Sequence, residues 1–259
     1  MSKERHRRKF KPTFENGGFW EYYGDLEHQF EDFLEYVPYI DKNEKVCSFR
    51  LTNILMNIGS HIDSAFKVMA QYRKFRKYPK CNEIKSIVKE AREKMKNNEF
   101  AKGPGIKLCL RAFEEIYKLS TNTVIFKRLP KREKILPFEV FNSQTKAPYW
   151  WDIYNHTKHD FHEKFEQATL RVTRDALAGA FLLNVIHDPA ILRLNDFGIL
   201  KWPPQPLESI EAEFYEHSLI RMPRFALEEM LEQKQSLWCF VETPLFIYDF
   251  NSEEENENE

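Results

Sequence analysis

Apolar residues recur at three- and four-residue intervals along most of the chain, and this periodicity predicts a mainly helical protein. The strongest pattern runs from Ser48 to about Phe75, with Ser48 placed to cap the first turn. Its inward-facing positions are Leu51, Ile54, Leu55, Ile58, Ile62, Phe66 and Met69. Further helices are predicted at Trp20–Tyr36, Glu83–Asn97, Lys107–Leu119 and 223–234. The segment Glu163–His187 is apolar nearly all round from Ala176 onwards, which indicates a central helix that the others surround.

Two segments carry short β-type patterns instead. Thr121–Lys127 is rich in β-branched residues, and the prolines that follow it fit one small hairpin inserted between helices. Near the C-terminus, residues 236–250 predict two short strands around Pro244. The expected fold is therefore mainly α, with a helical bundle over residues 18–187 and a small α/β C-terminal extension over residues 188–250.

The two ends of the chain differ sharply in charge, although the formal net charge is only −1. The first eleven residues hold six Lys and Arg side chains, whereas residues 251–259 hold five Glu and no base. We expect a flexible basic arm over residues 1–17 and a disordered acidic tail over residues 251–259. The arm could contact RNA or another polyanion, and a merely solvated terminus would have the same composition.

Composition narrows the class of protein further. Hydrophobic residues make up 42% of the chain, enough to fill a core, so a globally disordered protein is not expected. The four cysteines are scattered without zinc-like spacing, as in reduced cytosolic proteins. The sequence predicts neither a signal peptide nor an apolar run of about 20 residues that could cross a membrane. We therefore expect a cytoplasmic protein. No cofactor is expected either, because phosphate-binding loops and nucleophile elbows are absent from the sequence.

Residues 148–161, with the sequence PYWWDIYNHTKHDF, carry the candidate chemistry. We predict one helix across them, with Pro148 at its first position, where a missing N–H costs nothing. Trp150, Ile153, Thr157 and Phe161 share an inward stripe, and the tryptophans are expected to fill the core. The predicted site lies along the rim of this stripe and consists of Tyr154, Asn155, Lys158 and His159.

The pairing of two motifs resembles a known family. A long helix contains the sequence IGSHID at residues 58–63, and the later WWDIYNHTKH is followed by Ala-Thr-Leu at residues 168–170. This combination is similar to uncharacterised prokaryotic proteins with a WWxxYNxxKH motif that are related to the HEPN superfamily. The resemblance covers roughly residues 48–187 and implies a HEPN-like α-helical bundle. Many HEPN domains are metal-independent ribonucleases of toxin–antitoxin, abortive-infection and CRISPR defence systems.

The HEPN signature is an Arg, usually followed by a polar residue, with a His four to six positions beyond the Arg. Asn155 matches the polar position and His159 the His, whereas the Arg position falls on Tyr154. The resemblance implies RNA cleavage in which His159 is the general base or acid and Lys158 stabilises the phosphorane. It also implies a homodimer with a composite cleft, and an antitoxin or regulatory protein as a possible partner.

A catalytically inactive HEPN-like bundle is the alternative, acting as a nucleic-acid-binding, regulatory or scaffold module. The absent Arg favours it, and so does a run of basic and aromatic residues at 72–78 that could grip a single strand. The candidate nucleic-acid contacts in that run are Arg73, Lys74, Arg76 and Lys77. The end of a long solvated helix would have the same pattern, and Asn155 and His159 could simply form hydrogen bonds at a helix seam.

A metal site is a third reading of the same region, because His156, His159 and His162 lie close together in sequence. Spacings of three residues spread these side chains over about 120° of a helix, so one ion could not readily collect all three. A second helix would have to supply the remaining ligands. We therefore predict no metal site.

Overall fold

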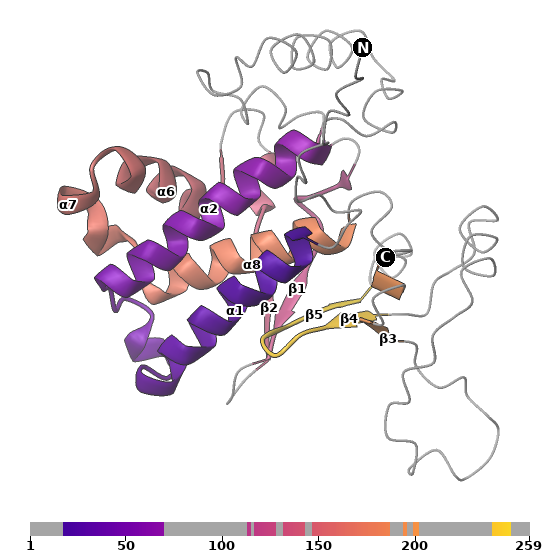
Figure 1. Cartoon of the computed structure of the whole chain (residues 1–259), viewed down its shortest axis with the longest axis horizontal. Helices are drawn as coiled ribbons and strands as arrows, with labels where there is room; N and C mark the ends of the chain where they lie inside the picture. The colour runs from indigo at the N-terminus through magenta and orange to yellow at the C-terminus, as the bar shows by residue number, and fades with distance from the viewer. Residues whose placement is uncertain are drawn as a thin grey trace, which may run out of the picture.

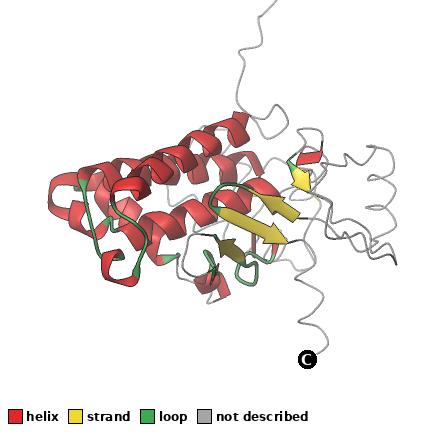
Figure 2. Ribbon diagram, turned by 90° about the horizontal axis from the view of Figure 1, so that it is seen from below, coloured by secondary structure: helices red, strands yellow, loops and turns green. Residues whose placement is uncertain are grey.

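The computed structural model describes residues 18–69, 113–114, 117–127, 132–142, 147–186, 194–195, 199–201 and 240–249. Over these ranges the protein is mainly helical, with one small antiparallel sheet packed against the helices (Figures 1 and 2). The helices are α1 (Gly18–Tyr36), α2 (Phe49–Met69), α6 (Tyr149–His159), α7 (Phe161–Lys164) and α8 (Leu170–Ile186). Short 3₁₀ turns are η2 (Asp41–Asn43), η4 (Glu139–Asn142) and η5 (Phe165–Gln167). None of the helices in the described ranges is long and apolar enough to span a membrane.

Helix α8 is the central element, as its all-round apolar pattern predicted. Its side chains are buried from Val172 to Val185 without interruption, and it packs against α1, α2 and α6. The predicted start at Glu163 was wrong, because α8 begins only at Leu170. The backbone N–H of Leu170 donates to the carbonyl of Val46 at 2.8 Å, in a β-bridge-like contact with the segment before α2. Residues 168–169, which take part in or adjoin this pairing, are not helical.

Helices α1 and α2 confirm the periodicity of the N-terminal half. Ser48 caps α2 as expected, because its Oγ accepts a hydrogen bond from the backbone N–H of Leu51 at 3.1 Å. The predicted continuation to Phe75 lies outside the described residues, which end for this helix at Met69. The helices expected at 83–97 and 223–234 also lie outside them. The helix expected at 107–119 is described only in part.

Helix α6 differs from its prediction at both ends. Pro148 precedes the helix in an extended conformation (ψ 144°), and its carbonyl accepts the N–H of Trp151 at 2.9 Å. The helix ends at His159 and does not continue to Phe161, because Asp160 leaves helical geometry at φ −147° and ψ 65°. Phe161 therefore opens α7 and does not share the inward stripe of Trp150.

Both predicted hairpins are present, and they join in one sheet. Its strand order is β2-β1-β5-β4-β3, with every neighbouring pair antiparallel. The strands are β1 (Val124–Phe126), β2 (Glu133–Ile135), β3 (Leu200–Lys201), β4 (Phe240–Glu242) and β5 (Phe246–Asp249). Ile125 pairs with Ile247, which brings the inserted hairpin and the C-terminal hairpin edge to edge.

One core joins the sheet to the helices. Phe246 of β5 stacks on Phe181 of α8 with ring centroids 5.6 Å apart, and Phe126 of β1 lies 5.6 Å from Phe246. All three rings are fully buried. Residues on both sides of position 187 thus contribute to the same sheet and the same hydrophobic core.

Candidate functional site

Helix α6 is anchored in the core by its first tryptophan. Trp150 is 1% exposed, and its Nε1–H donates to the carbonyl of Pro137 at 2.8 Å. Gly179 of α8 lets the indole approach closely, since a Cβ there would lie 3.0 Å from the nearest ring atom. The neighbouring Trp151 is also buried and meets Trp150 edge-on. Both tryptophans are core residues, so the rest of α6 projects from a rigid support.

Tyr154 lies inside the bundle. It is 3% exposed, and its ring covers the backbone of Gly59 on α2. A Cβ at Gly59 would fall 2.3 Å from a ring carbon, so the tyrosine ring would have to shift to admit any side chain. The absence of a side chain at position 59 therefore makes room for Tyr154. The phenol at the position of the signature Arg faces the core and brings no positive charge to the surface.

The other three predicted site residues lie at the C-terminal end of α6. Lys158 and His159 are exposed, and Asn155 is half-buried one turn before His159. The Lys158 Nζ lies 5.6 Å from the centroid of the Tyr154 ring. Basic side chains suit this end of a helix, where the backbone carbonyls carry partial negative charge. The structure thus groups Asn155, Lys158 and His159 at one end of α6, with Tyr154 beneath them.

A group of aromatic rings follows directly after this helix end. We call Phe49, Phe161 and Phe165 the phenylalanine stack. The Phe49 ring lies nearly parallel to those of Phe161 and Phe165, with centroids 6.0 and 4.6 Å away. Phe49 is 55% exposed although it is large and apolar. Phe161 is two residues beyond His159, so the stack begins directly after the polar helix end. The sequence analysis missed Phe49, since it precedes the apolar stripe of α2.

No three His, Cys, Asp or Glu side chains come together as a metal site among the residues that the structure describes. The side chains of His162 and Glu163 are not among those residues. His156 and His159 are both exposed on the last turn of α6. The basic run with Arg73, Lys74, Arg76 and Lys77 lies outside the described ranges, so its proposed contact with nucleic acid stays a prediction.

The histidine of the IGSHID motif is buried between three helices. His61 of α2 is 3% exposed and packs against the rings of Phe19 and Tyr22 on α1. Its Nε2 lies 3.0 Å from the amide nitrogen of Asn184 on α8, which also donates to the carbonyl of Ala180. Burial lowers the pKa of His61 to about 4. The imidazole is therefore neutral near pH 7 and accepts a hydrogen bond from Asn184.

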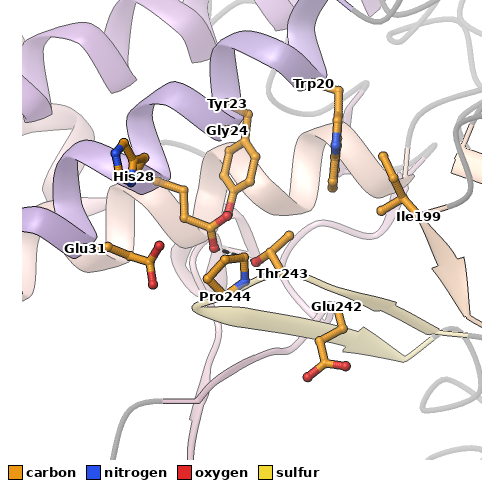
Figure 3. Close-up of a pocket in the computed structure, with 10 residues that line it drawn as sticks. Trp20, Tyr23, Gly24, His28, Glu31, Ile199, Glu242, Thr243 and Pro244 are labelled. Atoms are coloured by element: carbon orange, nitrogen blue, oxygen red, sulfur yellow. Dashed lines mark hydrogen bonds between the residues drawn. The ribbon is translucent and has the colours of Figure 1, made fainter. Parts of the chain in front are cut away.

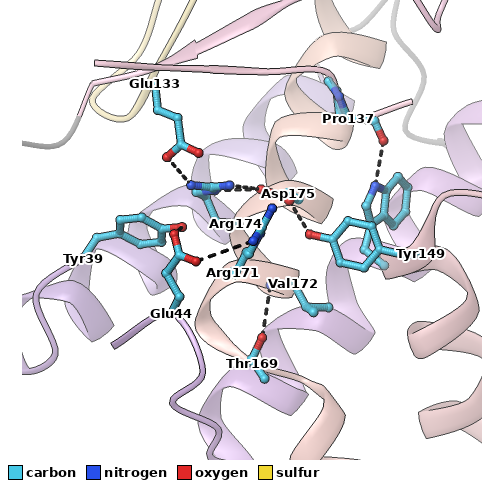
Figure 4. Close-up of polar contacts among 11 residues, drawn as sticks. Tyr39, Glu44, Glu133, Pro137, Tyr149, Thr169, Arg171, Val172, Arg174 and Asp175 are labelled. Carbon is cyan, nitrogen blue, oxygen red and sulfur yellow. Dashed lines mark hydrogen bonds and ion pairs between the residues drawn. The ribbon is translucent and has the colours of Figure 1, made fainter. Parts of the chain in front are cut away.

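A buried ionic cluster, which the sequence analysis did not single out, surrounds the second turn of α8 (Figure 4). Arg174 is 2% exposed and forms ion pairs with Glu133 of β2 and with Asp175. Its guanidinium carbon also lies 4.8 Å from the centroid of the Tyr39 ring. Asp175 accepts a hydrogen bond from the hydroxyl of Tyr149, the first residue of α6.

This cluster links α8, the sheet and the start of α6, and thereby fixes where α6 begins. Burial, followed by the nearby charge of Asp175, raises the pKa of Tyr149 above its usual value, so the phenol is neutral and donates. The adjacent Arg174 and Asp175 near the start of a mostly apolar helix were the available sequence signal, because buried charges in proteins are nearly always paired.

The chain has no counterpart in the comparisons: no protein-family model, curated protein or solved structure matches it.

Proposed function

We propose that this chain is a HEPN-like protein that acts on RNA in a prokaryotic defence or stress system, through the C-terminal end of α6. The observation that carries the proposal is the joint exposure of Lys158 and His159 on the last turn of a helix anchored in the core. Rigid support of this kind holds reactive groups in a constant geometry.

The surface has the parts that a single strand of RNA requires. The Lys158 ammonium can pair with a phosphate, and the 55% exposed Phe49 ring of the phenylalanine stack offers apolar aromatic surface for a base. Sequence-tolerant binding of single strands combines these two kinds of contact. The exposed phenylalanine beside a basic helix end therefore supports RNA as the ligand.

His159 gives the same surface a route to cleavage. A neutral imidazole can take the proton of a 2′-hydroxyl, whose oxygen then attacks the adjacent phosphate. An imidazolium can protonate the departing 5′-oxygen, and Lys158 can stabilise the charge on the phosphorane. One protomer offers His159 for one of these proton transfers, so a homodimer with two facing copies would supply both.

RNA binding without cleavage is the second candidate. It is favoured by the burial of Tyr154 against Gly59, because the position of the signature Arg then delivers no cation to the reacting phosphate. On this reading Lys158 and the phenylalanine stack hold RNA, and His159 contributes only polar contact. A regulatory role beside a partner protein would follow.

Labelled single-stranded RNA incubated with the protein in EDTA separates the two candidates. Cleavage that leaves 2′,3′-cyclic ends and is lost in His159→Ala supports the ribonuclease. His156→Ala is the matched control, since it removes an exposed imidazole from the same turn outside the signature, and it should retain activity. Intact RNA that shifts on a gel supports the binding module.

Salt dependence tests the assigned contacts. Loss of one phosphate contact in Lys158→Ala should reduce the slope of log affinity against log salt by about 0.7 for a single strand. Phe49→Ala should weaken binding about tenfold without changing that slope, because stacking is worth roughly 1–3 kcal/mol per base. RNA that is neither cleaved nor bound would overturn the proposal.

A further inference from the structure

A single carboxylate of α1 holds the turn between β4 and β5 against that helix (Figure 3). We call residues 243–246 the hairpin turn. The Oε1 atom of Glu27 accepts the hydroxyl of Thr243 at 2.5 Å and the backbone N–H of Leu245 at 3.0 Å. Glu27 is 3% exposed and lies 216 positions before Thr243 in the chain. One side chain thus provides two polar contacts between the first described helix and the C-terminal hairpin.

The hairpin turn has further hydrogen bonds that do not involve Glu27. The N–H of Thr243 donates to the carbonyl of Phe246 at 2.8 Å, and the N–H of Phe246 donates to Thr243 Oγ1 at 3.1 Å. Lys127, the residue after β1, donates its backbone N–H to the carbonyl of Leu245 at 2.8 Å. Its ammonium donates to the carbonyl of Thr243 at 3.0 Å. Loss of the Glu27 contacts would therefore release the turn from α1 without opening the hairpin itself.

A cavity of about 410 Å³ adjoins the Glu27 carboxylate. Its lining includes Gly24, Glu27 and His28 of α1 and, from the hairpin turn, Thr243 and Pro244. Gly24 and His28 are exposed, so water reaches the cavity. The cavity offers the Glu27 side chain a second position, in which the carboxylate leaves the hairpin turn and is hydrated.

Gly24 keeps this second position free. It lies three residues before Glu27, on the same face of α1. Glycine is less favourable than alanine in the interior of a helix, and a Cβ at position 24 would meet no atom within 4 Å. Packing therefore does not require the glycine, whereas movement of the Glu27 side chain into the cavity would use the space that it leaves.

Ionisation of Glu27 disfavours the closed position. Burial raises the pKa of its carboxyl to about 7, although hydrogen bonds from Thr243, Leu245 and Tyr23 act in the opposite direction. In water the same carboxyl has its ordinary pKa of 4.5. The closed position thus holds the proton more tightly than the open one, so a rise in pH shifts the side chain towards the open position.

We propose that Glu27 is a pH-dependent latch: the protonated side chain holds the hairpin turn against α1, and the ionised side chain moves into the cavity and releases the turn. The two pKa values give the size of the effect, because the ratio of open to closed molecules should rise roughly 70-fold between pH 5 and pH 8. The latch does not depend on the RNA-directed function of α6.

Hydrogen exchange at the Leu245 amide of the full chain, followed by NMR, tests the proposal. This N–H is protected by the Glu27 carboxylate, so its protection factor, corrected for the intrinsic exchange rate at each pH, reports the closed position. The protection factor should fall roughly 70-fold from pH 5 to pH 8. In Glu27→Gln it should stay constant, because the amide oxygen can accept the same two hydrogen bonds and cannot ionise.

Other titratable groups surround the latch, namely Tyr23, His28, Glu31, Glu242 and the Lys127 that pairs with Glu242. Histidines ordinarily change charge between pH 5 and pH 8, so His28→Gln is the matched control. It should keep the full pH dependence at Leu245. Loss of that dependence in His28→Gln would assign the effect to the imidazole and overturn the proposal.

Gly24→Leu tests the route into the cavity. The added side chain should occupy the space that the open position needs, so the fall in Leu245 protection should be largely abolished. The variant should fold, because leucine favours helix and the position is open. A fall that persists in folded Gly24→Leu would overturn the movement into the cavity.

Urea separates release of the latch from unfolding of the whole chain. Local release exposes little surface, so Leu245 protection at pH 8 should not change in urea below the unfolding transition. Protection of Ala178 in the buried helix α8 should fall with urea, because its exchange requires global unfolding. Equal urea dependence at both amides, constant Leu245 protection from pH 5 to pH 8, or an equal fall in Glu27→Gln would overturn the proposal.

Discussion

Replacement of His61 by glutamine should change how the stability of the protein depends on pH. The imidazole is buried between α1, α2 and α8, facing Phe19 and Tyr22 on one side and Asn184 on the other. Burial lowers its pKa from 6.5 to about 4. A protonated ring would also direct an N–H towards the amide nitrogen of Asn184, which can only donate.

The sign of the effect follows from proton uptake. Between pH 4 and 6.5 the unfolded chain holds a proton on His61 that the folded chain lacks, so the free energy of unfolding falls as pH falls through this window. The full interval corresponds to about 3 kcal/mol. Below pH 4 both states are protonated, and this group no longer contributes to the slope.

Glu27 acts in the opposite direction over nearly the same window. Its carboxyl is 3% exposed, and burial raises its pKa from 4.5 to about 7. Between these values the folded chain holds the additional proton, so the free energy of unfolding falls as pH rises, again by about 3 kcal/mol. In the native protein the two contributions should largely cancel between pH 4.5 and 6.5.

Urea unfolding followed by circular dichroism at steps from pH 4.5 to 6.5 would measure how His61 and Glu27 each contribute to the free energy of unfolding. Relative to the native protein, His61→Gln should lose about 3 kcal/mol as pH rises, and Glu27→Gln should gain about as much. The double variant should again run parallel to the native protein. Other carboxylates contribute equally to all four proteins, so they cancel in these differences. A His61→Gln difference that stays flat across the window would refute the reasoning.

Three packing predictions can be checked by the same urea titrations at pH 7. Gly59→Ala should destabilise the fold by about 1–3 kcal/mol, because the added methyl meets the tyrosine ring of α6, whereas Gly24→Ala should be neutral or stabilising by up to about 1 kcal/mol. Arg174→Met should cost roughly 3–5 kcal/mol, because the buried Asp175 carboxylate loses its guanidinium partner, whereas replacement of the largely exposed Arg171 by Met should cost less than about 1 kcal/mol. Trp150→Phe should cost about 1–3 kcal/mol, since the carbonyl that accepts its indole N–H is left without that donor.

Elements with a strong local signal could be predicted from the sequence. The Ser48 cap and the apolar period of α2 act within a few residues, and the same holds for the hairpin around Pro244. The joining of the two hairpins could not be predicted in this way. Ile125 and Ile247 are 122 positions apart, and strands of three or four residues carry too little pattern to select a partner.

In the candidate site, the sequence predicted the exposure of a side chain only where that exposure follows from its position on its own helix. Lys158 and His159 follow from their place on the polar face of α6, which the helical period gives. The burial of Tyr154 depends on Gly59, a residue of another helix whose missing side chain leaves room for the ring. The end of α6 at Asp160 was hidden because Phe161 continues the apolar period past the break.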